Sequence, residues 1–587
     1  MFQQNTENFN QWVKKNFTIV SDKFEIVDLR EKGQGRGLIA CENIKKNEVL
    51  FELSRDKILN VKTASINLLR EENKNILNSL NQWQSLIICV AYEWYIGDRS
   101  KFIHYFNVLP LTSNDYNSLM FWNDNELECL KPSGVLQRVG KNSAEEMYSL
   151  LVADIIPNRL KCQELADFLT LERFHIVASL IMSYSFDVDH FEGMEDDDED
   201  DDEDSVDSDD DISNDNHEHE HEHEHEHEHE HEHEHEHEHE HEHESKNNDD
   251  DDEVDDIKED NDDEQNPEEF EEIEDPISED SYYKSMVPLA DTLNSNTFLV
   301  NATLKYEKTK LVMIADKSIK KGEQIFNIYG ELPNSEILRK YGFVELPSSK
   351  FEFADIFLST IKLTFEKIFS SNFNFVKESQ VEKFVEFLFE TIQNSEYLEE
   401  NLSLEMDYGI VVDKYEVYPE GEILPELLLL VLILTSIFKA AESDEKWFKK
   451  IIKSIERKPS LDLISFTNRT ILKCHQLFED NSAITTTTVK HIKEIVKNRI
   501  NEYPKHIIDG SYKLPESYKN FNRQELSDIV LYDEITTLKN IDENFPPSED
   551  KKGPLISVVD DEKFLKNLMK RKNEEQDSKS NKKQKKN

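Results

Sequence analysis

The spacing of apolar residues changes several times along the chain. Apolar and polar residues alternate in residues 25–60, where "GLIACENI" and "EVLFEL" flank a polar "KKN", and this pattern predicts strands and turns. From about 63 to 192 apolar residues recur every three or four positions, as in "NQWQSLIICVAYEWYIG", which predicts helices. Alternation returns in "TKLVMIADKSIKKGEQIFNIYG", and helical spacing prevails from about 351, starting with "FADIFLSTIKLTFEKIF", to 510. We therefore predict an α+β protein with two strand-rich stretches separated by helices.

A sequence echo connects the two strand-rich stretches. "ACENIKKNEVLF" (40–51) and "ADKSIKKGEQIF" (315–326) agree at six of twelve positions. We interpret the echo as one β-rich domain whose halves are separated by a helical insertion, with chance resemblance as the alternative.

The strong negative charge of the chain is local. The formal charge of the chain is −56. Residues 195–280 hold 49 acidic residues and two lysines, a net charge of −47, so the rest of the chain carries −9. Fourteen His-Glu dipeptides occupy 217–244. With few apolar side chains this acidic insert is predicted to be disordered, either as a passive insertion, as a weak binder of divalent metal, or as an attractor of basic partners.

Cysteines and apolar runs exclude some protein classes. Five scattered cysteines form no CxxC pair, so we expect neither a disulfide framework nor a structural zinc site, and we assign no metal-binding residues to the site. The N-terminus lacks an apolar signal core. The run "ILPELLLLVLILTSIF" is too short to span a bilayer and predicts a buried helix with Pro425 in its first turn, so no membrane association is expected. Basic clusters at 570–572 and 582–586 fit either a solvated tail or a nuclear-import signal.

Three short stretches carry candidate chemistry. "KGQGRGLIA" (32–40) has three glycines that let the backbone approach a ligand or simply form a turn. "MVPLADTLNSNTFLVNATLKY" (286–306) has several Asn side chains, which hold polar ligands or cap turns. "GEQIFNIYGELPNSEILRKYGFVE" (322–345) has one tyrosine after a strand and another after a short helix that ends at Gly342; taken singly, such phenols are most often core residues.

In this order, with a helical insertion between them, the three stretches resemble the motifs of SET-domain protein-lysine methyltransferases. The likeness is to the class that includes the Rubisco large-subunit methyltransferase, and within it to the group of ribosomal-protein lysine methyltransferase 4 and SET-domain-containing protein 6. "KFIHYFNVLP", "FWNDNELECL" and "SLIMSYSF" are similar to parts of the insertion in that class. One departure is Ser295, where most relatives have His after Asn.

The resemblance implies a β-rich SET domain split by a helical insertion and followed by an all-helical substrate-binding domain. The boundaries that we predict are 15–62 and 281–346 for the two SET halves, 63–193 for the insertion, 194–280 for the acidic insert, 347–510 for the substrate-binding domain, and 511–587 for a C-terminal extension with a basic tail.

The resemblance also implies the chemistry, which is methyl transfer from S-adenosylmethionine to a lysine ε-amine. Tyr329 would be the catalytic phenol and Tyr341 would wall the cofactor and lysine channel. The cofactor-binding residues that it implies are Gln34, Gly35, Arg36, Asn294, Ser295 and Tyr341. The substrate-facing residues that it implies are Tyr184, Asp291 and Tyr306.

The substrate that we expect is a basic protein with a target lysine, such as a ribosomal protein, without direct binding of nucleic acid. An inactive SET-fold adaptor that holds basic partners through the acidic insert is the alternative; histidine methylation is less attractive because Tyr341 is present. We expect a monomer in the nucleus, with the cytoplasm as the alternative location.

Overall fold

The computed structural model describes residues 2–189, 282–402, 409–455, 461–546, 556–566 and 568. All of these residues fall within one compact unit. The predicted acidic insert and the basic clusters near the C-terminus lie outside the described residues.

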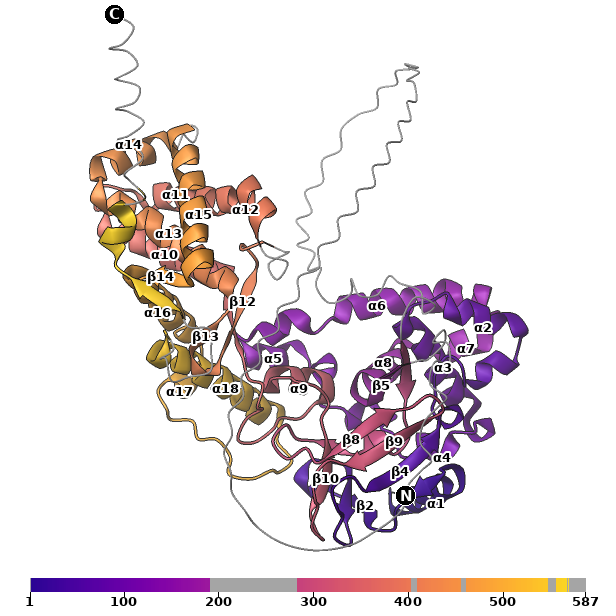
Figure 1. Ribbon diagram of the computed structural model, residues 1–587. Coiled ribbons are helices and arrows are strands. Elements are labelled where there is room, and N and C mark those ends of the chain that lie inside the picture. Colours follow the sequence, from indigo (N-terminus) through magenta and orange to yellow (C-terminus); the bar gives the residue numbers. More distant parts are fainter. Residues whose placement is uncertain are drawn as a thin grey trace, which may run out of the picture. The chain divides into compact units, whose positions relative to one another are not determined.

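Each of two four-stranded sheets combines strands that precede the helical insertion in the sequence with strands that follow it. The first has the order β1 (Ile19–Val20), β4 (Val49–Ser54), β9 (Lys310–Ala315) and β8 (Ala302–Tyr306). The second has the order β2 (Phe24–Asp28), β3 (Arg36–Ala40), β10 (Gln324–Asn327) and β7 (Asn294–Ser295). In Figure 1 the early strand β4 lies beside the later strand β9, and β8 lies on the other side of β9.

The two echoing segments exchange strands. β3, which precedes the first basic turn, pairs antiparallel with β10, which follows the second turn. In the same way β4 pairs antiparallel with β9. Between the pairs, Ile44 and Ile319 form an antiparallel bridge in which each N–H donates to the other's carbonyl, at 2.8 and 2.9 Å (N···O). The split β-rich domain predicted from the echo is confirmed, because the two halves complete each other's sheets.

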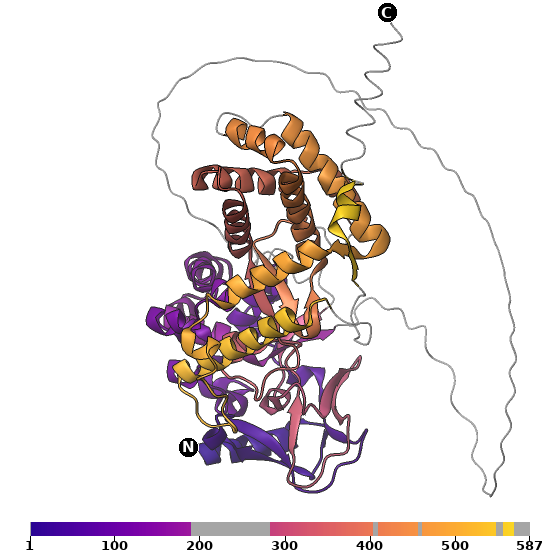
Figure 2. The same ribbon diagram turned by 90° about the vertical axis from the view of Figure 1, so that its left-hand side faces the viewer.

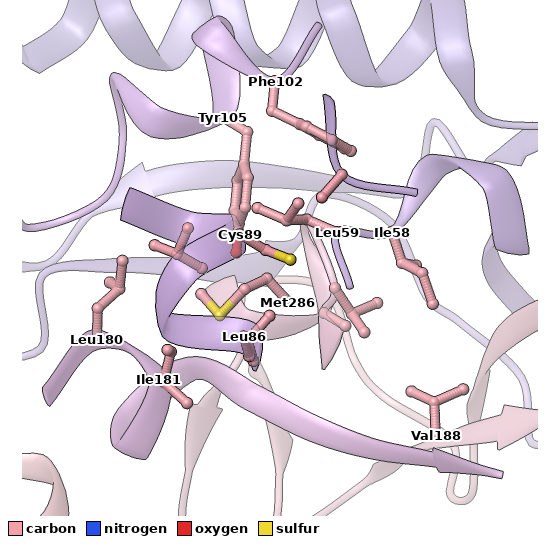
Figure 3. Packing of buried hydrophobic residues seen from close by; sticks show 14 of the residues in the cluster. Ile58, Leu59, Leu86, Cys89, Phe102, Tyr105, Leu180, Ile181, Val188 and Met286 are labelled. Atoms are coloured by element: carbon pink, nitrogen blue, oxygen red, sulfur yellow. The ribbon is translucent and has the colours of Figure 1, made fainter. Parts of the chain in front are cut away.

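The helical insertion forms one core with these sheets. Its helices are α2 (Glu71–Asn78), α3 (Gln82–Ile96), α4 (Ile103–Phe106), α5 (Asp124–Leu127), α6 (Lys141–Leu150), α7 (Gln163–Phe168) and α8 (Leu171–Tyr184). Figure 3 shows Leu86 and Cys89 of α3 packed near Met286 and Tyr105, all four almost fully buried. The helix α3 ends before Gly97, as its spacing predicts.

An antiparallel pair of strands closes the insertion. β5 (Ser185–Asp189) begins directly after α8, so the last two residues of the predicted helix "LERFHIVASLIMSYSF" belong to a strand. β5 pairs antiparallel with β6 (Tyr282–Met286), which brings Asp189 opposite Tyr282.

The C-terminal part is mainly helical. Its helices are α10 (Leu358–Asn372), α11 (Glu378–Gln393), α12 (Glu396–Asn401), α13 (Pro425–Ser443), α14 (Glu445–Ile455), α15 (Leu461–Asn481), α16 (Thr486–Ile500), α17 (Lys505–Ile508) and α18 (Arg523–Asn544). Its strands are β11 (Ala354–Phe357), β12 (Lys414–Tyr418), β13 (Glu422–Ile423), β14 (Ala483–Thr485) and β15 (Ser557–Val559). The remaining helices are α1 (Phe2–Asn16) at the N-terminus and α9 (Asn334–Tyr341) after β10.

Two details of this part concern the sequence predictions. The helix expected from about residue 351 starts only at Leu358, because 354–357 form β11 and pair with β12. The predicted buried helix is α13, with Pro425 at its first position and its apolar residues buried. Among the helices that the structure describes, none combines the length and apolarity that crossing a membrane requires.

The last long helix joins the C-terminal part to the split β-rich domain and its helical insertion. Leu526 and Ile529 of α18 lie in one buried cluster with Leu119 and Trp122 of the insertion and Leu338 of α9. α16 lies alongside α18 (Figure 2). Residues beyond 510, which we had predicted only as an extension, therefore contribute to the core.

Arg499 of α16 connects three parts of the fold through buried hydrogen bonds. Its side chain is fully buried. The guanidinium donates to the carbonyl of Pro132 in the insertion at 2.7 Å and to the carbonyl of Asp355 in β11 at 2.8 Å, and its Nη1 lies 2.5 Å from Glu502 Oε2.

We expect Arg499→Ala to lower the free energy of unfolding by about 3 kcal/mol, because the two carbonyls and the carboxylate lose their charged donor. Urea unfolding of the full chain measures the change. Lys497→Ala on the same helix is the matched control, since that side chain is 62% exposed and its ion pair with Asp542 spans 3.7 Å. Equal losses for the two variants would contradict this role for Arg499.

Candidate active site

The two tyrosines of the third motif lie against each other. Tyr329 follows the end of β10 by two residues, and Tyr341 is the last residue of α9. Their ring centroids are 4.8 Å apart, and Tyr341 Oη donates to the carbonyl of Tyr329 at 3.2 Å. Tyr329 Oη donates to the carbonyl of Leu293 at 2.7 Å, which connects the third motif to the second.

Phe343 completes an aromatic group with the two tyrosines and was not among the predicted site residues. Its ring centroid lies 6.3 Å from that of Tyr329 and 6.2 Å from that of Tyr341. The chain reaches it through Gly342, which has a left-handed φ of 76° and whose Cβ would lie 2.6 Å from the backbone N of Ser118. The signal in the sequence was the glycine after the helix, which turns the next side chain back toward the tyrosines.

Asn294 and Ser295 form β7, which pairs in parallel with β10. Asn294 Nδ2 donates to the carbonyl of Arg36 at 3.2 Å, and Ser295 Oγ accepts the N–H of Tyr329 at 3.3 Å. The second motif therefore touches both the first and the third. Gly37 is required for this approach, because a Cβ there would lie 2.8 Å from Asn294 Nδ2.

The glycine-rich loop presents backbone and unpaired polar groups. Gly33 and Gly35 have positive φ values of 71° and 62°, and a Cβ on Gly35 would meet nothing within 4 Å. Within the described residues, the buried atoms Gln34 Oε1 and, from β10, Gln324 Nε2 have no hydrogen-bond partner. Buried polar atoms normally have partners, so this loop fits a ligand that carries donors and acceptors.

The side chain of Arg36 is used within the protein. Its guanidinium donates to Thr6 Oγ1 at 3.0 Å and to the carbonyl of Val108 at 2.8 Å, and it lies 3.8 Å from the ring centroid of Phe2. Arg36 therefore faces a ligand at this loop with its backbone.

A buried acid lies beside the tyrosines. Tyr105 Oη, from the insertion, donates a hydrogen bond to Asp291 Oδ2, and both residues are buried. Burial raises the pKa of Asp291 to about 7, although the hydrogen bonds from Tyr105 and Thr292 act in the opposite direction. Burial, and then the charge of Asp291, raise the pKa of Tyr184 to about 12.

Two of the three predicted substrate-facing residues, Tyr184 and Asp291, act electrostatically on Tyr329. Burial raises the pKa of Tyr329 well above its usual value, and the nearby Tyr184, Tyr341 and Asp291 raise it further. Tyr306 at the end of β8 differs: burial and the carboxylates of Asp187 and Asp189 in β5 raise its pKa to about 12.

The carboxylates of β5 therefore act electrostatically on Tyr306. Tyr341 shares one of these neighbours, because its own pKa of about 12 reflects burial and also the charge of Asp187.

Comparison with known proteins agrees with this geometry. The SET domain model matches residues 35–330. The chain is 32% identical to ribosomal lysine N-methyltransferase 4 of Saccharomyces cerevisiae, over 99% of this chain and 98% of that protein. The chain belongs to the SET-domain protein-lysine methyltransferases. The family resemblance drawn from the three motifs is thereby confirmed.

Other SET-domain relatives match over shorter ranges. N-lysine methyltransferase SETD6 of Homo sapiens is 26% identical over 56% of this chain and 52% of its own length. A crystal structure of the SET domain of LSMT, bound to lysine and AdoHcy, has a TM-score of 0.50 at 16% identity and covers 92% of this chain and 91% of that one. That likeness shows the fold, in which a split SET domain is followed by a helical part.

The family to which the chain belongs and its three motifs imply S-adenosylmethionine as the cofactor. The unpaired Gln34 Oε1, the open space at Gly35 and the backbone of Asn294 and Ser295 fit a ligand of that polarity. Among the described residues, no group of three or more His, Cys, Asp or Glu side chains is arranged to hold a metal ion.

The buried carboxyl group of Asp291 should make the stability of the SET domain depend on pH. Its pKa in the folded protein, about 7, exceeds the ordinary 3.8. The free energy of unfolding that the protonated carboxyl contributes is therefore complete below pH 3.8 and is lost as the pH rises toward 7. In the wild type, this group should make the free energy of unfolding fall by about 1.4 kcal/mol per pH unit between pH 5 and 6.5, the slope that one bound proton produces. We expect Asp291→Asn to remove that part of the slope.

Urea unfolding at several pH values measures this slope. Asp187→Asn is the control, because that side chain is 53% exposed and pairs with Lys284 at 2.7 Å. Identical slopes for the wild type and Asp291→Asn would contradict a raised pKa at Asp291.

Proposed function

We propose that this SET-domain protein transfers a methyl group from S-adenosylmethionine to a lysine ε-amine of a ribosomal protein. The observation that carries the chemistry is that the second motif binds Tyr329 through Leu293 and Ser295. Asn294, between these two residues, donates to the Arg36 carbonyl and so joins the first motif to the same site. The ribosomal substrate is supported by the likeness, over nearly the whole length of both chains, to a yeast enzyme named as a ribosomal lysine N-methyltransferase.

The cofactor would be held by backbone groups of Gln34, Gly35 and Arg36 on one side and by Asn294 and Ser295 on the other. S-adenosylmethionine supplies a methyl group on a cationic sulfur, which a neutral amine can attack. The Asn294 side chain spans the two sides by donating to the carbonyl of Arg36. The two sides therefore keep a fixed separation, which aligned group transfer requires.

The lysine must arrive near the tyrosines and release a proton to water before the methyl transfer, since its ordinary pKa is about 10.4. In this proposal, the Asp291 carboxyl attracts the ammonium group, and the buried surroundings favour the neutral amine. Tyr184, Tyr306 and Tyr341 would contact the lysine side chain.

Tyr329 would orient the amine. Its hydroxyl proton is used in the hydrogen bond to the Leu293 carbonyl, so Oη offers its lone pairs to an amine N–H. Accepting one N–H fixes the direction of the nitrogen lone pair. With its pKa raised well above the usual value, the phenol stays neutral and acts by positioning, without removing a proton.

Ser295 was the one sequence feature that favoured an inactive adaptor. Its hydroxyl accepts the N–H of Tyr329 at 3.3 Å, so serine at this position contributes to the site. The contacts described above therefore favour the enzyme. A nuclear location remains a prediction from the basic clusters.

We expect Tyr329→Phe to lower kcat at least tenfold, a loss of about 1.4 kcal/mol of transition-state stabilisation, because the amine loses its acceptor. Methyl transfer from labelled S-adenosylmethionine measures the effect, with thermal unfolding as a check of folding. Tyr418→Phe in β12 is the control: it removes a hydroxyl that donates to Glu416 and should leave kcat within twofold. An unimpaired, folded Tyr329→Phe enzyme would refute the role of Tyr329.

The substrate is tested separately. The purified full chain should transfer label to ribosomal proteins prepared from cells that lack this enzyme, and mass spectrometry should place the label on lysine. Core histones serve as an equally basic comparison. Labelling of histones alone would overturn the ribosomal assignment and leave the lysine chemistry intact.

A further inference from the structure

A short segment from the C-terminal part lies against the SET domain at its cofactor-binding side. Residues 517–521, here called the strap, lie between α17 and α18. From the sequence, this region is expected only to be part of a C-terminal extension. The strap contacts the second and the first halves of the SET domain, in both cases next to the residues to which we assign cofactor binding.

Contact with the second SET half is made by Tyr518. Its Oη accepts the N–H of Leu346 at 2.9 Å and a longer hydrogen bond of 3.5 Å from Asn296 Nδ2. Asn296 directly follows Ser295, and its Oδ1 accepts the N–H groups of Phe298 at 3.1 Å and Leu299 at 2.9 Å. Tyr518 therefore holds the side chain that organises the turn after Asn294 and Ser295.

The same turn is held from a second direction. The fully buried Glu345, next to Leu346, accepts the N–H of Thr297 at 3.0 Å and its hydroxyl at 2.5 Å. Because Glu345 and Leu346 are adjacent, Tyr518 fixes the segment from which Glu345 reaches the turn.

Contact with the first SET half is made by the strap's backbone. If Gly33 carried a Cβ, that atom would lie 3.2 Å from the carbonyl oxygen of Lys519 and 3.9 Å from Asn520 Cα. Gly33 immediately precedes Gln34, so the strap lies against the glycine-rich loop as well as the turn at Asn296.

The strap is itself anchored. Phe521 is 8% exposed and belongs to the buried cluster with Leu338 and Val344. Asn522 Oδ1 accepts the N–H of Glu525 at the start of α18, and Lys519 Nζ lies 2.5 Å from Glu525 Oε1. A strap fixed to α18 can set the separation of the two loops that it touches.

We propose that Tyr518 is a positioning residue for S-adenosylmethionine: acting through Asn296 and Leu346, it fixes the turn at Asn294–Ser295 opposite the glycine-rich loop. The proposal rests on the cofactor site assigned above. Without the hydroxyl, the Leu346 N–H and the Asn296 amide lose their shared acceptor and the turn loosens. Part of the binding free energy is then used to order the turn.

We expect Tyr518→Phe to weaken S-adenosylmethionine binding about five- to tenfold, measured by isothermal titration calorimetry on the full chain. In steady-state assays KM for S-adenosylmethionine should rise by the same factor, with kcat and KM for the protein substrate within twofold. Tyr512→Phe, outside the strap and packed on Tyr532 at 5.6 Å between ring centroids, is the matched control and should bind like the wild type.

The outcomes separate this proposal from the proposed function. If the wild type binds no S-adenosylmethionine, the function fails. If the wild type binds and folded Tyr518→Phe binds equally well, the role of Tyr518 fails. A general loss of kcat and stability, with unchanged cofactor affinity, also overturns it.

A measurement on the wild type covers the case in which Tyr518→Phe does not fold. Hydrogen exchange of the full chain should slow at Leu346 and residues 518–521 when S-adenosylmethionine is added. Residues 505–510 in and after α17 serve as the internal reference and should not change. Unchanged exchange at Leu346 and the strap, with cofactor bound, would overturn the proposal.

Discussion

The candidate site depends on the exchange of strands between the two halves of the SET domain. The pairs β3–β10 and β4–β9, with the Ile44–Ile319 bridge between them, join segments far apart in the sequence by main-chain hydrogen bonds. A slip of one residue in such a pair would turn every side chain to the opposite face. The register therefore decides that Asn294 reaches the Arg36 carbonyl, so the site is positioned by backbone.

Burial governs the electrostatics of the site. Desolvation is the largest cause of the raised pKa values of Tyr329, Tyr184 and Asp291. The same effect lowers the pKa of a lysine that enters, because low polarity disfavours any charged form. Neutral phenols and a neutral amine thus result from one cause. Asp291, with a pKa of about 7, is the group among these whose charge changes near physiological pH.

The C-terminal part is joined to the SET domain by buried polar contacts as well as by apolar packing. Arg499 spans α16, β11 and the insertion, and α18 packs against the insertion and α9. Tyr341 ends α9, so the helix that presents one of the site tyrosines rests on α18. The aromatic group is consequently joined to the C-terminal part through α9.

The sequence by itself determined most of the element types, because periodicity and glycines are local properties, and the order of its three motifs indicated the split SET fold by resemblance to a known family. It placed α3, α9 and α13 correctly but missed β11, whose four residues have an apolar pattern that also suits a helix. Tyr105 and Tyr518 had no local signal that tied them to the site, whereas Gly342 was the local signal for Phe343. Only the tertiary structure brought them there, because strand register, helix packing and desolvation depend on residues distant in the chain.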